Sequence, residues 1–186
     1  LSDSPGREIE AKRLQLLKEV VPSIDRIGVV LDSTGRRDPR PMQQAGKLLG
    51  IGLLMSLETA NRTEFRATFA ALKRDGADGI YAPETPVNAQ HRDLIVELAA
   101  EYRLPAIYGS REFVDAGGLM SYGTSFPELY RRLVVYVDRI LPGTKPRDLP
   151  VEQPSQLELA ANLNTATALD IRLPPTILQG ADHVIK

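Results

Sequence analysis

Residues 26–32 read RIGVVLD, a short apolar run bounded by Arg26 and Asp32. The valines and the isoleucine favour extended backbone, and an unbroken apolar run is typical of a strand that is buried on both faces. Strands of this kind belong to parallel sheets that helices cover. The stretch therefore predicts a buried parallel strand, and the periodic leucines before it predict a helix over residues 8–21.

The same strand and helix signals alternate further along the chain. Helices are predicted from the stripe at residues 42–49, from Asn61 as an N-cap, and from Thr85 as a cap followed by Pro86. Apolar strands are predicted between them at residues 51–58, 80–83 and 104–109. Four such alternations predict an α/β fold, a parallel sheet with helices on both faces.

The pattern changes after residue 116. The run GGLMSY at residues 117–122 is short enough to be a strand or a crossing segment, and a helix is predicted around residues 129–140. A Pro/Gly-rich linker then leads to a predicted strand within residues 155–164. Gly117 and Gly118 permit backbone conformations closed to other residues, which predicts either a tight turn or a hinge between lobes.

Composition excludes several classes of partner and site. The 186 residues carry a net charge of −1 with acids and bases interspersed, which indicates neither a nucleic-acid nor an anionic-membrane partner. The absence of cysteine excludes disulfides and thiolate metal sites. No apolar run reaches the roughly 18 residues that a transmembrane segment needs.

Polar residues follow the predicted strands, where open parallel sheets bind ligands. Tyr122 lies in the crossing segment and offers an aromatic face and a hydroxyl. The alternative is that these residues only end strands and cap helices. The predicted ligand-binding set is Asp32, Ser33, Glu58, Glu84, Thr85, Tyr108 and Tyr122.

No pattern predicts a catalytic residue, a metal site or a cofactor. His91 and His183 lack a second ligand at metal-binding spacing. The sequence contains no G-x-S-x-G, no Walker A motif and no G-x-G-x-x-G. An enzyme that uses Asp32 or Glu84 stays an alternative, but no nucleophile–base pair supports it.

Four stretches together resemble a known family: residues 11–32, 103–123, 136–171 and 173–182, with GGLMSYG and LPVEQP as the most specific runs. They are similar to ABC-transporter substrate-binding proteins of the tryptophan/tyrosine-binding type. The family often has Trp-Asn-Pro after the first strand of this lobe, whereas this chain has Leu31-Asp32-Ser33. The departure predicts a ligand that differs accordingly.

The resemblance implies a function. It implies two lobes of the periplasmic-binding-protein type I kind that close around a small organic solute, such as an amino acid, and deliver it to the membrane permease of an ABC transporter. It further implies a periplasmic or extracellular, membrane-anchored protein without enzymatic activity. A ligand-sensing effector domain of a transcription regulator with the same two-lobe fold stays the alternative.

The resemblance also predicts how the chain divides. Residues 26–115 would form a complete lobe, while residues 1–25 and 116–186 would form crossover segments and part of the first lobe. Most of the first lobe, and any targeting segment, would come from sequence ahead of Leu1. On this interpretation the strands near residues 119–122 and 157–162 lack sheet partners, and the helix at residues 129–140 has an uncovered apolar face.

Overall fold

The computed structural model describes residues 5–31, 38–56, 59–149 and 157–186. The strands are β1 Arg26–Val29, β2 Gly52–Met55, β3 Gly79–Ala82, β4 Ala106–Tyr108, β5 Met120–Thr124, β6 Leu157–Asn162 and β7 His183–Ile185. The helices are α1 Pro5–Val20, α2 Arg40–Leu49, α3 Arg62–Arg74, α4 Pro86–Gln90, α5 Arg92–Glu101, α6 Arg111–Asp115, α7 Phe126–Ile140, α8 Leu163–Ala168 and α9 Pro175–Gly180, with a 3₁₀ turn at Pro146–Asp148.

The described strands form one seven-stranded sheet in the order β2-β1-β3-β4-β5-β6-β7. All neighbouring pairs are parallel except β5 and β6, which are antiparallel. The predicted α/β fold with a largely parallel sheet is therefore confirmed. The expectation that β5 and β6 lack sheet partners is wrong, because β5 pairs with β4 and β6, and β6 pairs with β7 as well.

Each face of the sheet has its own apolar core. One core joins α1, α2, α8 and α9 to the sheet, with Leu14, Leu17 and Ile27 fully buried. The other joins α3, α5 and α6 to the sheet, with Phe65 and Phe69 fully buried. The predicted boundary near residue 115 lies within this continuous sheet, so the proposed division into lobes is not a division of the sheet itself.

Capping residues begin two of the helices where the sequence predicts. The Asn61 side chain accepts hydrogen bonds from the backbone N–H groups of Thr63 and Glu64, which begins α3. The Thr85 hydroxyl accepts from the N–H of Asn88 at 3.1 Å, which begins α4. The predicted helix after Thr85 is interrupted at His91, whose φ of −105° and ψ of 17° separate α4 from α5.

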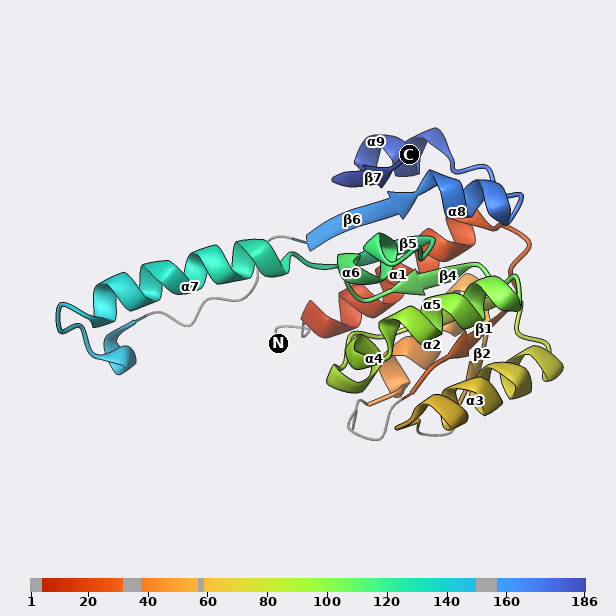
Figure 1. The fold of residues 1–186 in the computed structure, drawn as a ribbon, viewed down its shortest axis with the longest axis horizontal. Helices are drawn as coiled ribbons and strands as arrows, with labels where there is room; N and C mark the ends of the chain where they lie inside the picture. The colour runs from red at the N-terminus through yellow and green to blue at the C-terminus, as the bar shows by residue number, and fades with distance from the viewer. Residues whose placement is uncertain (1–4, 32–37, 57–58, 150–156) are drawn as a thin grey trace.

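Helix α7 projects away from the sheet and its flanking helices (Figure 1). Its apolar residues stay accessible: Tyr130 is 64% exposed and Val134 is 57% exposed, and Leu141 just beyond the helix is 78% exposed. The expectation that the apolar face of this helix has little to cover it agrees with these exposed fractions, although Leu129 and Tyr136 are half-buried. Figure 1 shows α7 leaving the sheet on the side where β5 ends and α1 begins.

The glycines of the GGLMSYG stretch lie where other segments pass very close. A Cβ atom on Gly118 would lie 2.5 Å from the Tyr108 ring, and one on Gly123 would lie 1.8 Å from the Gly109 carbonyl oxygen. Gly117 has a φ of +105°, a backbone conformation that residues other than glycine rarely adopt. Backbone crowding and backbone conformation therefore explain the glycines, and the hinge at Gly117 and Gly118 stays a prediction.

The close crossing of Gly123 and Gly109 gives a first testable prediction. Gly123→Ala forces two backbone segments apart, so we expect a loss of at least about 2 kcal/mol in the free energy of unfolding in urea. Gly52→Ala is the matched control, because a Cβ on Gly52 in β2 meets nothing closer than 3.5 Å. Equal stability of the two variants would contradict the crowding.

Candidate functional site

The carboxyl ends of β1 and β3 are tied together by one buried side chain. Asn88 on α4 is 0% exposed, and its Nδ2 donates to the Val30 carbonyl at 3.3 Å and to the Pro83 carbonyl at 2.9 Å. Each of these carbonyls lies just past the end of its strand, so Asn88 fixes the spacing between the two strand ends. Sequence reasoning missed this residue, which has the appearance of an ordinary polar position in a short helix.

The end of β1 is also tied to the segment that follows β2. The Leu31 N–H donates to the Ser56 hydroxyl at 2.9 Å, and the Leu31 carbonyl accepts from the Thr59 hydroxyl at 2.6 Å and from the Thr59 N–H at 3.1 Å. The two segments that flank the predicted residues Asp32, Ser33 and Glu58 therefore meet at this edge. Those three residues lie outside the described ranges, and their roles stay predictions.

A buried arginine joins the ends of the next strands to α1. Arg13 is 5% exposed, and its Nη1 donates to the Tyr81 hydroxyl at 2.8 Å. Its Nε donates to the Tyr122 carbonyl at 2.6 Å, and its Nη2 to the Gly109 carbonyl at 3.3 Å. One guanidinium thus contacts β3, β5 and the residue that follows β4, which uses the planar fork of donors that lysine lacks.

Glu10 supplies the charge that Arg13 needs in this buried position. Its carboxylate lies 3.8 Å from Arg13 Nη1 and also accepts a short hydrogen bond from the Tyr81 hydroxyl. A buried guanidinium is costly without such compensation. Burial raises the pKa of Tyr81 well above its ordinary value of 10.0, and the positive charge of Arg13 opposes that rise.

Sequence reasoning also missed Arg13, although a signal exists. Arg13 shares the spacing of Leu17 and Val20, two buried residues that lie one and two turns further along α1. A charged residue on the apolar stripe of a predicted helix is unusual, because arginine is almost never buried without a partner. Its spacing from Glu10, three residues earlier, supplied a candidate partner.

The structure brings some of the other predicted residues to this edge. Glu84 follows the end of β3, and Tyr122 lies in β5. Both residues are partly exposed. The backbones of both residues lie close to Gly109. A Cβ atom on Gly109 would lie 2.4 Å from the Glu84 backbone nitrogen. Arg13 donates hydrogen bonds to the carbonyls of both Gly109 and Tyr122. Thr85 is 8% exposed, and its hydroxyl is engaged in capping α4.

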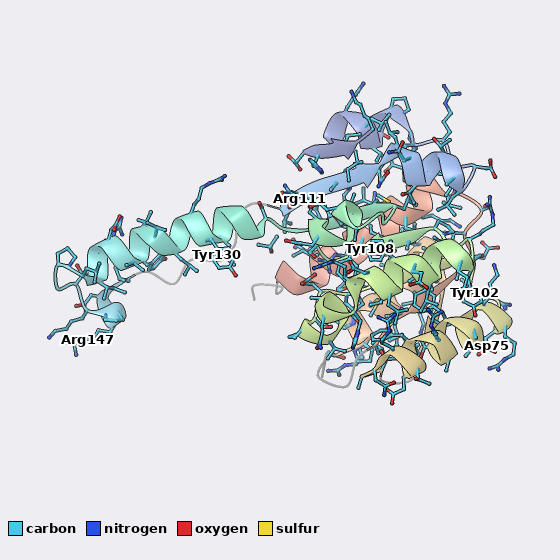
Figure 2. The ribbon with its side chains drawn as sticks, viewed as in Figure 1. Asp75, Tyr102, Tyr108, Arg111, Tyr130 and Arg147 are labelled. Atoms are coloured by element: carbon cyan, nitrogen blue, oxygen red, sulfur yellow. The ribbon has the colours of Figure 1, made fainter. Side chains whose placement is uncertain are left out.

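Tyr108 lies in the core rather than at the edge. Its side chain is 1% exposed, and its ring stacks on Phe113 with centroids 4.8 Å apart. Figure 2 shows Tyr108 within the body of the molecule, whereas Tyr130 and Arg147 lie out along the projecting segment. In this structure the Tyr108 ring offers no surface to a solute, because it covers α6 instead.

The described part of the edge combines partly exposed residues with a fixed backbone. It includes the partly exposed residues Glu84 and Tyr122, on a backbone held by Asn88 and Arg13. Within the described ranges, no group of three or more histidine and acidic side chains could hold a metal ion. Over the same ranges, no helix is both long enough and apolar enough to cross a bilayer.

Buried Tyr108 gives a prediction about pH. Burial raises its pKa above the ordinary 10.0 of an unfolded tyrosine, so the stability it contributes is complete below pH 10 and is lost as pH rises above 10. Above pH 10 this loss is at most about 1.4 kcal/mol in the free energy of unfolding for each pH unit. We expect Tyr108→Phe to lack this part of the pH dependence. Urea unfolding at several pH values up to 11 measures it, and parallel pH profiles for both proteins would contradict it.

A comparison with protein families assigns nearly the whole chain to a family. The model of a family described as ABC transporter substrate binding protein matches residues 6–185. Among curated proteins, none matches the chain.

Solved structures share the fold. A conserved domain protein from Vibrio cholerae is 22% identical, with a TM-score of 0.83, over 94% of this chain and 60% of that one. An ABC domain in complex with L-Trp from Streptococcus pneumonia is 21% identical, with a TM-score of 0.85, over 95% and 60%. A ligand-free, open substrate binding protein with adhesive properties from Clostridium difficile is 21% identical, with a TM-score of 0.66, over 94% and 59%. The chain thus spans about 60% of the length of the first of these relatives.

Proposed function

Because the chain belongs to the family of ABC transporter substrate-binding proteins, we propose that it forms one wall of a solute-binding cleft. The wall is the edge of the sheet where β1, β3, β4 and β5 end. The protein captures a small organic solute there, leaves it chemically unchanged and delivers it to a membrane permease. The observation that carries this proposal is the set of buried side chains, Arg13 and Asn88, that hold the strand ends in fixed positions.

The opposite wall comes from a second body that α7 enters. The helix leaves the sheet at the same edge as the proposed cleft, and most of its apolar residues are exposed, among them Tyr130, Leu133 and Val134. Burial of such residues is worth roughly 25 cal/mol per Å², so a second body that packs on α7 gains stability. On this proposal residues 1–25 and 116–186 are crossover segments that also contribute to the first lobe.

The solute class that suits the wall best is an amino acid. The Glu84 carboxylate can pair with an ammonium group, and the Tyr122 ring offers an apolar face with a hydroxyl. The L-Trp complex of the similar Streptococcus pneumonia domain supports this class. Asp32, Ser33 and Glu58 are further proposed contacts, and the proposed location of the protein is periplasmic or extracellular with a membrane anchor.

The experiment is a titration of the isotopically labelled 186-residue protein with each of the twenty amino acids, followed by NMR amide shifts. A single wall binds weakly, and NMR detects millimolar affinity. We expect at least one amino acid to shift the Glu84 and Tyr122 amides, and Glu84→Gln to weaken its affinity about tenfold through loss of a charge-assisted hydrogen bond.

Glu101→Gln is the matched control. Glu101 ends α5 at the opposite edge of the sheet, where it pairs with Arg66 at 3.6 Å. This variant should bind like the unmodified protein. Absence of shifts with every amino acid would contradict the proposed solute class, and equal weakening by both substitutions would contradict the role of Glu84.

A further inference from the structure

We propose that Arg13 is a positioning residue, which locks α1 to the end of β5 and so sets the direction in which α7 leaves the sheet. The Arg13 guanidinium does not contact the solute in this proposal. Arg13 instead holds the β5 backbone, which leads into α7 and so toward the proposed second wall. The effect of Arg13 on solute affinity rests on the proposed solute-binding function. Its effect on the direction of α7 can be tested without any solute.

The contacts of Arg13 lie at the root of the projecting segment. Its Nε donates to the Tyr122 carbonyl at 2.6 Å, and β5 ends two residues later at Thr124. Across the antiparallel pair, Thr124 faces Leu157, where β6 begins. The outgoing and returning ends of the segment between β5 and β6 therefore meet beside the Arg13 contact.

The same guanidinium reaches the neighbouring strands as well. Nη2 donates to the Gly109 carbonyl, the atom on which Gly123 packs so closely that a Cβ there would lie 1.8 Å away. Nη1 donates to Tyr81, whose ring also lies under the guanidinium with its centroid 5.7 Å from Arg13 Cζ. Arg13 is thus held from several directions and does not act as a single replaceable hydrogen bond.

A fixed root has a consequence for closure of the cleft. If α1 and β5 cannot move relative to each other, bending is confined to residues beyond the Arg13 contacts. The free protein then samples a narrow range of α7 directions, and the fraction of molecules ready to bind stays high. The apparent dissociation constant rises in inverse proportion to that fraction, so a tenfold smaller fraction weakens affinity about tenfold.

The test uses the absence of cysteine from the chain. Spin labels are attached at Lys47→Cys on α2 and at Arg139→Cys on α7, both exposed positions, and pulsed electron paramagnetic resonance measures the distance distribution between them. Arg13→Lys keeps the charge but loses the fork of donors. The matched control is Arg103→Lys, which alters an exposed ion pair with Asp170 at the opposite edge of the sheet.

We expect Arg13→Lys to broaden the distance distribution and Arg103→Lys to leave it unchanged. Superimposable distributions in the Arg13→Lys variant and the parent protein would overturn the inference. If Arg13→Lys does not fold, as judged by circular dichroism, Arg13→Gln serves instead, because its shorter side chain ends in a single amide and cannot reach all three acceptors at once. An unchanged distribution in that variant overturns the inference equally.

A second measurement separates this inference from the proposed function. L-tryptophan is titrated into the parent protein and both arginine variants, and affinity is read from NMR shifts. We expect Arg13→Lys to weaken binding about tenfold, because release of the Tyr122 backbone leaves fewer molecules with the wall in its binding-competent shape, while Arg103→Lys does not. Parent binding without an effect of Arg13→Lys overturns the inference alone. If the parent does not bind L-tryptophan, the distance distributions still decide whether Arg13 positions α7.

Discussion

A guanidinium that is 5% exposed must find its hydrogen-bond acceptors inside the protein. Arg13 finds them at the ends of adjacent strands, and the acceptors include backbone carbonyls that no side-chain substitution can remove. The cost of burying this charge is offset only when α1 and the strands are all in place. The contact therefore makes the docking of α1 and the alignment of the strand ends mutually dependent. The relative positions of the strand ends at the carboxyl edge of the sheet therefore depend on this contact.

The alternation of side chains along the strands then decides which aromatic residue serves which role. Tyr81 in β3 points toward α1 and reaches Arg13, whereas Tyr108 in β4 points to the other face and stacks on Phe113. Successive residues of a strand point to opposite faces, so a shift of one residue along a strand exchanges a contact with Arg13 for stacking on Phe113. Position at a strand end places a residue at one edge of the sheet. It did not indicate the face on which a side chain lies.

The features that the sequence predicted are those that depend on near neighbours. Apolar runs such as RIGVVLD, the cap at Asn61 and the cap at Thr85 carry their structural reason within a few residues. The contacts of Arg13 with Tyr122 and Gly109 span 109 and 96 residues, and the antiparallel pairing of β5 with β6 closes across a long excursion. No local pattern encodes such partners. The edge was therefore predictable as a place, while the residues that build it were not.

The antiparallel pairing of β5 with β6 means that the projecting segment connects the two strands of a β-hairpin. Since Thr124 faces Leu157, residues 125–156 are in effect the loop of a β-hairpin into which a whole helix has been inserted. The entropy of closing a loop grows only slowly, by about 0.6 kcal/mol for each doubling of its length. Compared with a two-residue turn, the 32 residues are four doublings, so the longer loop costs the hairpin about 2.4 kcal/mol, which the packing of the sheet must offset. Once that cost is met, a further change in the length of the arm adds little, so the sheet and the arm can diverge as separate modules.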